Sequence, residues 1–454
     1  MTAQRTATVT ETSAATTTQA APAAVTTQRY GHLELGFTTS MKTAWFASTS
    51  PAGLYNPLSP DSSSGWRSLG TVFCSRTEDA VLMVKDHSPQ KDLLVSPSRY
   101  QGIVSISMSG RVVAKVWRPV PPSSDYVALG VYVTDGADPP SDAVACVKKT
   151  HSGRTYARHG ELSSPVDTAL FHKMFRYNIA PLYPHGDAEE HLILPVGRLS
   201  VAGDTPAPNE TTWVLDVPAV VEKFDGPDTP DLENYNPPPN LTMITDRAVT
   251  VPFYMVDDKS RPTSWKVENS PFYKILRKRQ FRLVRHVDFR GGGGGQISET
   301  VEQGVSKEKS EEFSLTTGIE VGVSVGVEAS AKPFGMGAST TVTTSVSTSI
   351  ETGYTSRYGV TTMESKTVGV TYNVPADHAG ALWVESHELL PVRADNALVT
   401  NATLKFDSGS YIGRTYPHSN QPPPQVSPQP ASDQQLTSIW EIADDLTETV
   451  SGSG

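Results

Sequence analysis

The residue types that most often do chemistry do not stand at catalytic or metal-binding spacings in this sequence. The 11 histidines do not show the spacing of metal ligands, and the two segments His185-Gly186-Asp187 and Glu189-Glu190-His191 are isolated. The glycine run 291–295 lacks the Lys and the Ser or Thr that follow a phosphate-binding loop, and no Gly-x-Ser-x-Gly elbow occurs. We therefore expect no enzyme, no cofactor and no metal site.

A second kind of chemistry, insertion into lipid, is indicated by alternating residues. From Phe313 to Lys332 the odd positions are apolar except Thr317, and the even positions carry Ser, Thr, Gly, Glu or Lys. A period of two indicates a strand with one apolar and one polar face. This strand would be about twenty residues long, whereas most strands have five or six.

The alternation resumes after a turn at 333–337, now with apolar or Thr side chains at the even positions from Ala338 to Tyr354. The sequence therefore predicts a long hairpin. Its two apolar faces coincide in one register, which gives the cross-strand pairs Ala331–Ala338, Val327–Val342, Val323–Val346 and Ile319–Ile350.

Two interpretations of this hairpin compete. It could be a ribbon that covers a soluble core, or it could enter a membrane. We favour insertion, because a membrane strand needs only about 9 to 11 residues and these small side chains suit both environments. The expected lipid face is Phe313, Leu315, Ile319, Val321, Val323, Val325, Val327, Ala329, Val342, Val346, Ile350 and Tyr354. The expected tip is Phe334 and Met336, and the expected pore lumen is Glu320, Glu328, Lys332 and Glu351.

The segments around the hairpin resemble the aerolysin-like β-pore-forming toxins, in the branch of epsilon toxin and mosquitocidal toxin. The resemblance lies in the run Ser306–Ser314, in the Ser/Thr-rich return strand and in the exit through 367–374 and 382–384. It implies binding to a lipid or glycan receptor on a target membrane, assembly of identical chains into a ring, and release of one hairpin per protomer into a shared barrel.

Composition limits the fold class and the partners. A hydrophobic fraction of 37%, with 35 prolines and 34 glycines, favours short strands and turns, so we expect an all-β protein. A net charge of -10 supplies no overall attraction to nucleic acid. Only Cys74 and Cys146 are present, which excludes a disulfide scaffold and leaves a single bridge open.

The first folded domain is expected over residues 29–205, after a disordered arm at 1–28. Within it, the segment 65–85 returns at about 126–148, an offset of about 60 residues, which indicates a stacked β assembly. The run from Val116 to Gly130 resembles the vacuolar protein sorting-associated protein 62 family. This resemblance implies a β-prism-like recognition domain.

The pore-forming module is expected over residues 206–415 and a Pro-rich linker with a C-terminal tail over 416–454. Arg414 is the last Lys or Arg of the chain, and we expect it to be an activation cleavage site. The N-terminus has no apolar core of a secretory signal, so we expect a soluble protein that leaves the cell by another route. The alternative function is a non-lytic carbohydrate- or lipid-binding β module, with a hydrolase as a more distant class.

Overall fold

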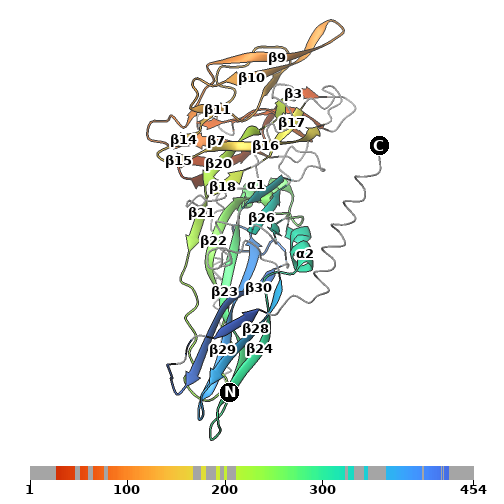
Figure 1. Cartoon of the computed structure of the whole chain (residues 1–454). Coiled ribbons are helices and arrows are strands. Elements are labelled where there is room, and N and C mark those ends of the chain that lie inside the picture. Colours follow the sequence, from red (N-terminus) through yellow and green to blue (C-terminus); the bar gives the residue numbers. More distant parts are fainter. Residues whose placement is uncertain are drawn as a thin grey trace, which may run out of the picture.

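The computed structural model describes residues 27–46, 52–59, 65–75, 80–166, 175–179, 191–194, 199–201, 211–317, 319–322, 326–331, 342–345, 365–400, 403–420, 422 and 424–428. These residues form an elongated molecule with a broad head at one end and a long, narrow body at the other (Figure 1). All paired strands in the described residues are antiparallel, and the all-β prediction is confirmed.

The head is built from short sheets. Two of them carry the first part of the chain, in the orders β1(Gln28–Tyr30), β2(Leu33–Thr38), β7(Val81–Asp86), β5(Trp66–Arg67) and β3(Met41–Phe46), β4(Ala52–Pro57), β6(Val72–Ser75). Three more follow, in the orders β11(Tyr126–Ala128), β13(Cys146–Lys148), β8(Leu94–Val95), then β12(Tyr132–Thr134), β10(Arg111–Val120), β9(Arg99–Met108), and the pair β14(Thr150–His151), β15(Arg154–Thr155).

One further sheet closes the head, in the order β18(His191–Leu194), β20(Thr211–Pro218), β16(Ala157–Val166), β17(Phe175–Ile179), β19(Leu199–Val201). By strand pairing, the head therefore extends to Pro218, beyond the boundary expected at residue 205. Cys146 is a free, buried thiol, so the bridge that the sequence left open does not form in this structure.

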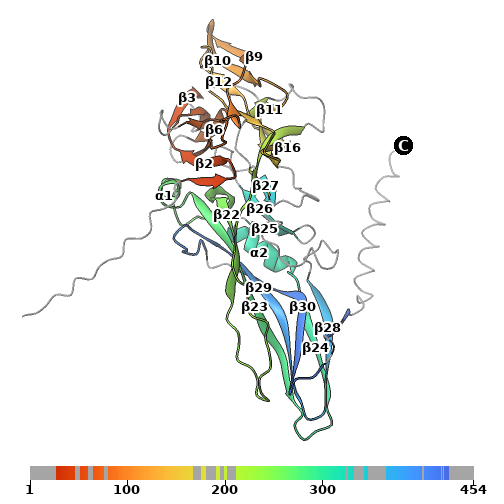
Figure 2. The same ribbon diagram turned by 90° about the vertical axis from the view of Figure 1, so that its left-hand side faces the viewer.

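The body consists of two sheets that lie against each other along its length (Figure 2). The larger has the order β21(Val220–Lys223), β22(Ile244–Pro252), β23(Phe272–Asp288), β29(Ala379–Val392), β30(Leu404–Tyr416). The smaller has the order β24(Gly295–Gln303), β28(Lys366–Val374), β31(Gln425–Pro428). Valines and other apolar residues of β24 and β28 pack on Leu382 and Val384 of β29 and form the core between the sheets.

The glycine run 291–295 connects β23 to β24 at the far end of the body. Gly294 has a φ of +76°, and a Cβ there would lie 2.6 Å from the backbone nitrogen of Ala376. Only glycine fits this close approach, so the run gives the turn between the two sheets its shape.

Head and body share one hydrophobic core. Phe37 of the head contacts Phe253 and Tyr254, with ring centroids 5.0 and 6.0 Å apart, and the Tyr30 hydroxyl donates a hydrogen bond of 3.1 Å to the Thr250 carbonyl. The 3₁₀ helix η1(Phe253–Met255) supplies three buried residues of this junction, and α1(Thr263–Asn269) follows it. The aromatic junction fixes the head to the body by packing rather than by a linker alone.

Candidate functional site

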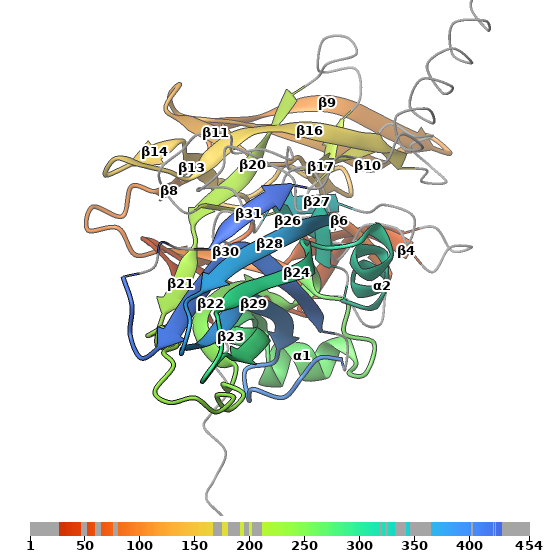
Figure 3. The same cartoon turned by 60° about the horizontal axis from the view of Figure 1, so that its bottom comes forward.

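The segment expected to insert into membranes begins in a helix in this structure. Helix α2 covers Lys307–Thr317, follows β24 in the chain and contacts β30 of the larger sheet (Figure 3). The Ser306 hydroxyl accepts a hydrogen bond of 3.3 Å from the Lys309 backbone nitrogen, and Glu308 lies in the first turn. Both features stabilise a helix N-terminus, and Lys and Glu are good helix formers. These local preferences outweigh the period of two in the folded chain, so residues 313–317, which the sequence pattern placed in a strand, are helical in this structure.

The helix separates two residues that a strand would place on one face. Phe313 is 1% exposed and belongs to the shared core, whereas Leu315 is 77% exposed. Two residues along a helix differ by about 200° in direction, whereas two residues along a strand point the same way. Phe313 therefore anchors α2 to the body, and Leu315 stands in solvent.

After α2 the described residues form three short strands, and the part of the segment that the structure describes is not one long hairpin. They are β25(Ile319–Gly322), β26(Gly326–Ala331) and β27(Val342–Ser345), in that order in one sheet. The observed pairs are Val321 with Val327 and Ala331 with Val342, so the predicted register of Ala331 with Ala338 is not the one formed. Gly322 and Gly326, at the facing ends of β25 and β26, favour a reversal where the sequence pattern predicted a continuous strand.

The expected lipid-facing and lumen residues are thus distributed over several elements. Ile319, Glu320 and Val321 lie in β25, Glu328 and Ala329 in β26. The other expected residues lie outside the described part of the chain: Val323, Val325, Lys332, Phe334, Met336, Val346, Ile350, Glu351 and Tyr354. Their expected positions in a membrane remain predictions.

The end of α2 is tied to a buried ionic network that sequence reasoning missed. The Thr317 carbonyl accepts a 2.7 Å hydrogen bond from the Asp257 backbone nitrogen. The neighbouring Asp258 carboxylate accepts two hydrogen bonds from Arg393, of 2.8 and 2.9 Å, and one of 2.6 Å from Tyr273. Asp258 and Arg393 lie 135 positions apart, and only the fold brings them together.

The pKa values in this network follow from burial and hydrogen bonding. Burial raises the pKa of Asp258, but hydrogen bonds from Arg393, Tyr273 and Ser260 outweigh it and lower the pKa to about 2. Burial, together with the adjacent carboxylate, raises the pKa of Tyr273. The network therefore holds a charged carboxylate at neutral pH and fixes the segment that carries the Asp257 hydrogen bond.

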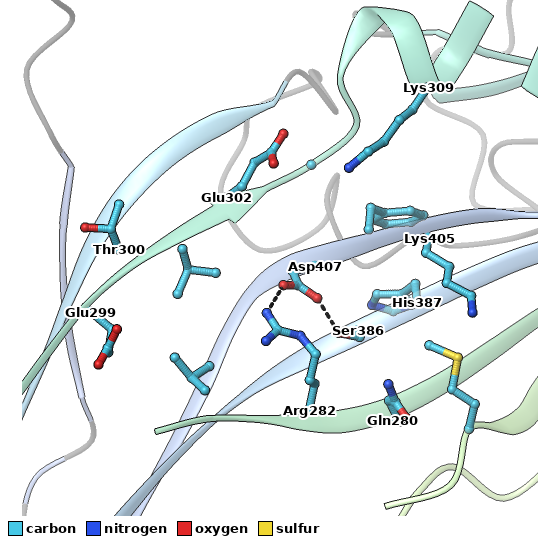
Figure 4. Close-up of a pocket in the computed structure, with 15 residues that line it drawn as sticks. Gln280, Arg282, Glu299, Thr300, Glu302, Lys309, Ser386, His387, Lys405 and Asp407 are labelled. Carbon is cyan, nitrogen blue, oxygen red and sulfur yellow. Dashed lines mark hydrogen bonds and ion pairs between the residues drawn. The ribbon is translucent and has the colours of Figure 1, made fainter. Parts of the chain in front are cut away.

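A polar hollow of about 450 Å³ lies beneath the N-terminal half of α2, between the larger sheet and β24 (Figure 4). Asp407 accepts hydrogen bonds from Arg282 and from Ser386 on its floor, and Lys309 of α2 reaches its rim. This half of α2 therefore faces a hollow, whereas the half that contains Phe313 packs into the core.

The basic side chains of β23 are largely neutralised. Arg277 and Arg279 share Asp246, at 2.6 and 3.3 Å, and Lys274 lies 2.6 Å from Glu222. Of the glutamates near the hairpin, Glu299 lies 3.5 Å from Arg285. These four basic side chains of β23 therefore form ion pairs within the body.

Strand β31, from the Pro-rich linker, pairs with β28. Gln425 to Pro428 lie opposite Thr371 to Val368 and cover the free edge of the smaller sheet. Arg414 lies inside β30, opposite Ala381, rather than in an exposed linker. A protease needs an unpaired, extended chain, so cleavage at Arg414 would first require the end of β30 to open.

Two negative findings apply to the described residues. No helix among them is long and apolar enough to cross a membrane. No group of three or more His, Cys, Asp or Glu side chains in the same residues is arranged to hold a metal ion.

Comparisons with known proteins match the two parts of the chain separately. Residues 20–179 match the family model of vacuolar protein sorting-associated protein 62, and residues 244–399 match that of Insecticidal Crystal Toxin, P42. The first match confirms the resemblance of the N-terminal domain. No protein of curated function matches the chain significantly.

Two solved structures show a weak likeness to this chain. The alignment with the crystal structure of Cry35Ab1 covers 86% of this chain and 91% of the Cry35Ab1 chain, with a TM-score of 0.31 and 11% identity. The alignment with the crystal structure of GNIP1Aa from Chromobacterium piscinae covers 39% of this chain and 34% of the GNIP1Aa chain, with a TM-score of 0.28 and 18% identity. The chain therefore joins a head similar to the sorting-protein family to a body similar to an insecticidal toxin family.

Proposed function

We propose that this chain is a pore-forming toxin. It binds a lipid or glycan receptor on a target membrane, assembles with copies of itself into a ring and inserts one amphipathic hairpin per protomer into a shared β-barrel, in the manner of the aerolysin-like toxins. The observation that carries the proposal is the two-faced alternation of residues 313–354 within and beside a segment similar to an insecticidal toxin family.

In the folded body, the described residues of the alternating segment do not form a long ribbon. Its first residues form α2, and the described residues that follow form the three short strands β25, β26 and β27. A segment that changes conformation needs a sequence that fits both states. The pattern of residues 313–354 suits a membrane hairpin, although its described residues are folded differently in this structure.

Insertion therefore needs α2 to open at its C-terminal end. Phe313 must leave the shared core, and the hydrogen bond between Asp257 and Thr317 must break, before residues 313–317 can become extended. The cost of withdrawing Phe313 keeps the hairpin folded in solution, and membrane contacts must offset it.

A ring is required because unpaired backbone groups cannot be solvated in lipid, so the barrel must close on itself. In the isolated chain, β31 covers the edge of β28. Removal of β31 would expose an edge that can pair with a neighbouring protomer.

Release of an encapsulated dye tests the proposal. Liposomes made from insect midgut lipids, and insect cells, are incubated with the full chain, and sedimented membranes are examined for ring-sized oligomers. We expect dye release together with oligomers. Binding without release would instead favour a non-lytic binding module, and turnover of a substrate without release would favour an enzyme.

A further inference from the structure

The two internal repeats of the head build the same cross-strand pair of an aromatic ring and a lysine. In the first repeat Trp66 of β5 lies opposite Lys85 of β7, and in the second Tyr126 of β11 lies opposite Lys148 of β13. The lysine Nζ lies 5.8 Å from the ring centroid in the first pair and 5.9 Å in the second. The repetition in sequence is thus a repetition in surface geometry.

Each pair is extended by a carboxylate and a histidine. Glu34 of β2 lies opposite Lys85, and its Oε2 is 2.5 Å from His87 Nε2. In the second repeat, Asp92 Oδ2 is 2.5 Å from Lys148 Nζ, and Asp92 Oδ1 is 3.4 Å from His151 Nδ1. We call these sets the first polar row (Glu34, Trp66, Lys85, His87) and the second polar row (Asp92, Tyr126, Lys148, His151).

The hydrophobic core of the head does not contain these polar residues. In both repeats the buried residue beside the lysine, Val84 or Val147, supplies the core contact, and the lysine lies at the surface. The side chains of Glu34, His87, Lys148 and Asp92 keep between 18% and 34% of their surface exposed. The residue types differ between the repeats, but the sequence of aromatic, cation, carboxylate and imidazole is kept.

His32 places the two rows next to each other. Its ring centroid is 5.3 Å from that of His151, and its carbonyl accepts a 2.8 Å hydrogen bond from the His87 backbone nitrogen. A ligand larger than one ring unit could therefore touch both rows.

Three buried polar atoms at this place have no hydrogen-bond partner among the described residues: His32 Nδ1, His151 Nε2 and Asp92 Oδ1. His151 is 8% exposed. Buried polar groups are rarely left without partners, so we expect an ordered water molecule or a group of a bound ligand at this cluster.

The balance of charges selects the ligand. An anion would meet Glu34 and Asp92, and a cation would meet Lys85 and Lys148. A hydroxyl group donates and accepts, so it can satisfy carboxylates, ammonium groups and imidazoles at once. The rings of Trp66 and Tyr126 add flat apolar surface beside these groups, as sites for small polar ligands usually do.

We propose that the two polar rows are two equivalent saccharide-binding sites on the head. The proposal deepens the recognition step of the proposed function, by making the receptor a glycan. Because binding of free sugar needs no membrane, its failure can be told apart from a failure to form pores.

The experiment measures binding of free glucose, galactose, mannose and N-acetylglucosamine to the full chain by saturation-transfer NMR and calorimetry, with sodium sulfate as an anion probe. The variants are Glu34→Gln and Asp92→Asn, which keep side-chain shape and remove one charged acceptor each. The matched control is Lys115→Ala, because Lys115 Nζ also lies over a tryptophan ring, 3.7 Å from the centroid of Trp117.

We expect at least one sugar to bind at two sites. Each single variant should lose one site, the double variant should bind more than tenfold more weakly, and Lys115→Ala should bind as the unaltered chain does. Thermal unfolding of each variant verifies that it is folded. The proposal is overturned if no sugar binds, if sulfate alone binds, or if the folded double variant still binds at two sites.

Discussion

The positions of Phe313 and Leu315 in the structure differ from those that the sequence pattern predicts. Both were expected on one lipid-facing surface, yet Phe313 is buried in the shared core and Leu315 projects into solvent. The same two side chains can return to one face only if the helix becomes extended. Under the proposed function, the stability of α2 is therefore the quantity that controls whether the segment is released.

Replacing Phe313 with Ala should lower the free energy of unfolding by about 3 to 5 kcal/mol, because a large buried side chain leaves a cavity. The matched control Leu315→Ala should change it by less than about 0.5 kcal/mol, since that side chain is exposed. Urea denaturation followed by circular dichroism measures both. Equal effects of the two substitutions would contradict the burial assigned to Phe313.

Asp258 holds the segment to which the end of α2 is bonded. Its pKa in the folded chain is about 2, below its ordinary value of 3.8. The contribution of this carboxylate to stability is therefore present above about pH 4 and is lost as the pH falls through about 2.

Substituting Asp258 with Asn should destabilise the chain by about 3 to 5 kcal/mol at pH 7, because Arg393 is left buried without its counter-ion. It should also flatten the dependence of stability on pH between about 4 and 2. Asp257→Asn is the control, since the Asp257 carboxylate is 41% exposed beside Lys259 and such pairs contribute little. Denaturation curves at several pH values would contradict this account if both variants behaved alike.

At the scale of elements, one face of the proposed inserted hairpin contacts lipid and the other contacts water. Val323→Arg should reduce dye release strongly, because a charge facing lipid costs about 2 to 4 kcal/mol in each protomer. Ser324→Arg should be tolerated, since Ser324 faces the aqueous lumen in the proposed inserted strand. Lysis that is equally strong with both variants would show that the derived facing is wrong.

Much of the architecture follows from sequence patterns. Composition and short apolar runs separated by Gly and Pro predicted an all-β protein, and a repeated segment predicted a stacked β assembly in the head. The helix α2 escaped prediction because its capping Ser306 and its Lys and Glu residues were interpreted as the flank of a strand. The ion pair between Asp258 and Arg393 could not be predicted, since residues so far apart in sequence carry no local signal of their contact.

At the scale of the whole molecule, head and body form one packed unit through the aromatic junction around Phe253, and the C-terminal segment closes a sheet edge. Ending the chain after Asn420 would remove β31 and leave β30 complete. We expect this truncated chain to form oligomers on liposomes faster than the full chain, because the edge of β28 becomes available. Native gels of solubilised membranes measure the rate, and an unchanged rate would leave the segment without an inhibitory role.

Current through a planar lipid bilayer tests pore formation most directly. If the chain forms closed barrels of fixed size, its addition to one side should produce discrete, stable current steps of uniform height. The Val323→Arg variant should produce few or none, and Ser324→Arg should produce steps with altered ion selectivity, because its charge lies in the lumen. A gradual, irregular leak, or no current with a chain that still binds the bilayer, would contradict the proposed pore.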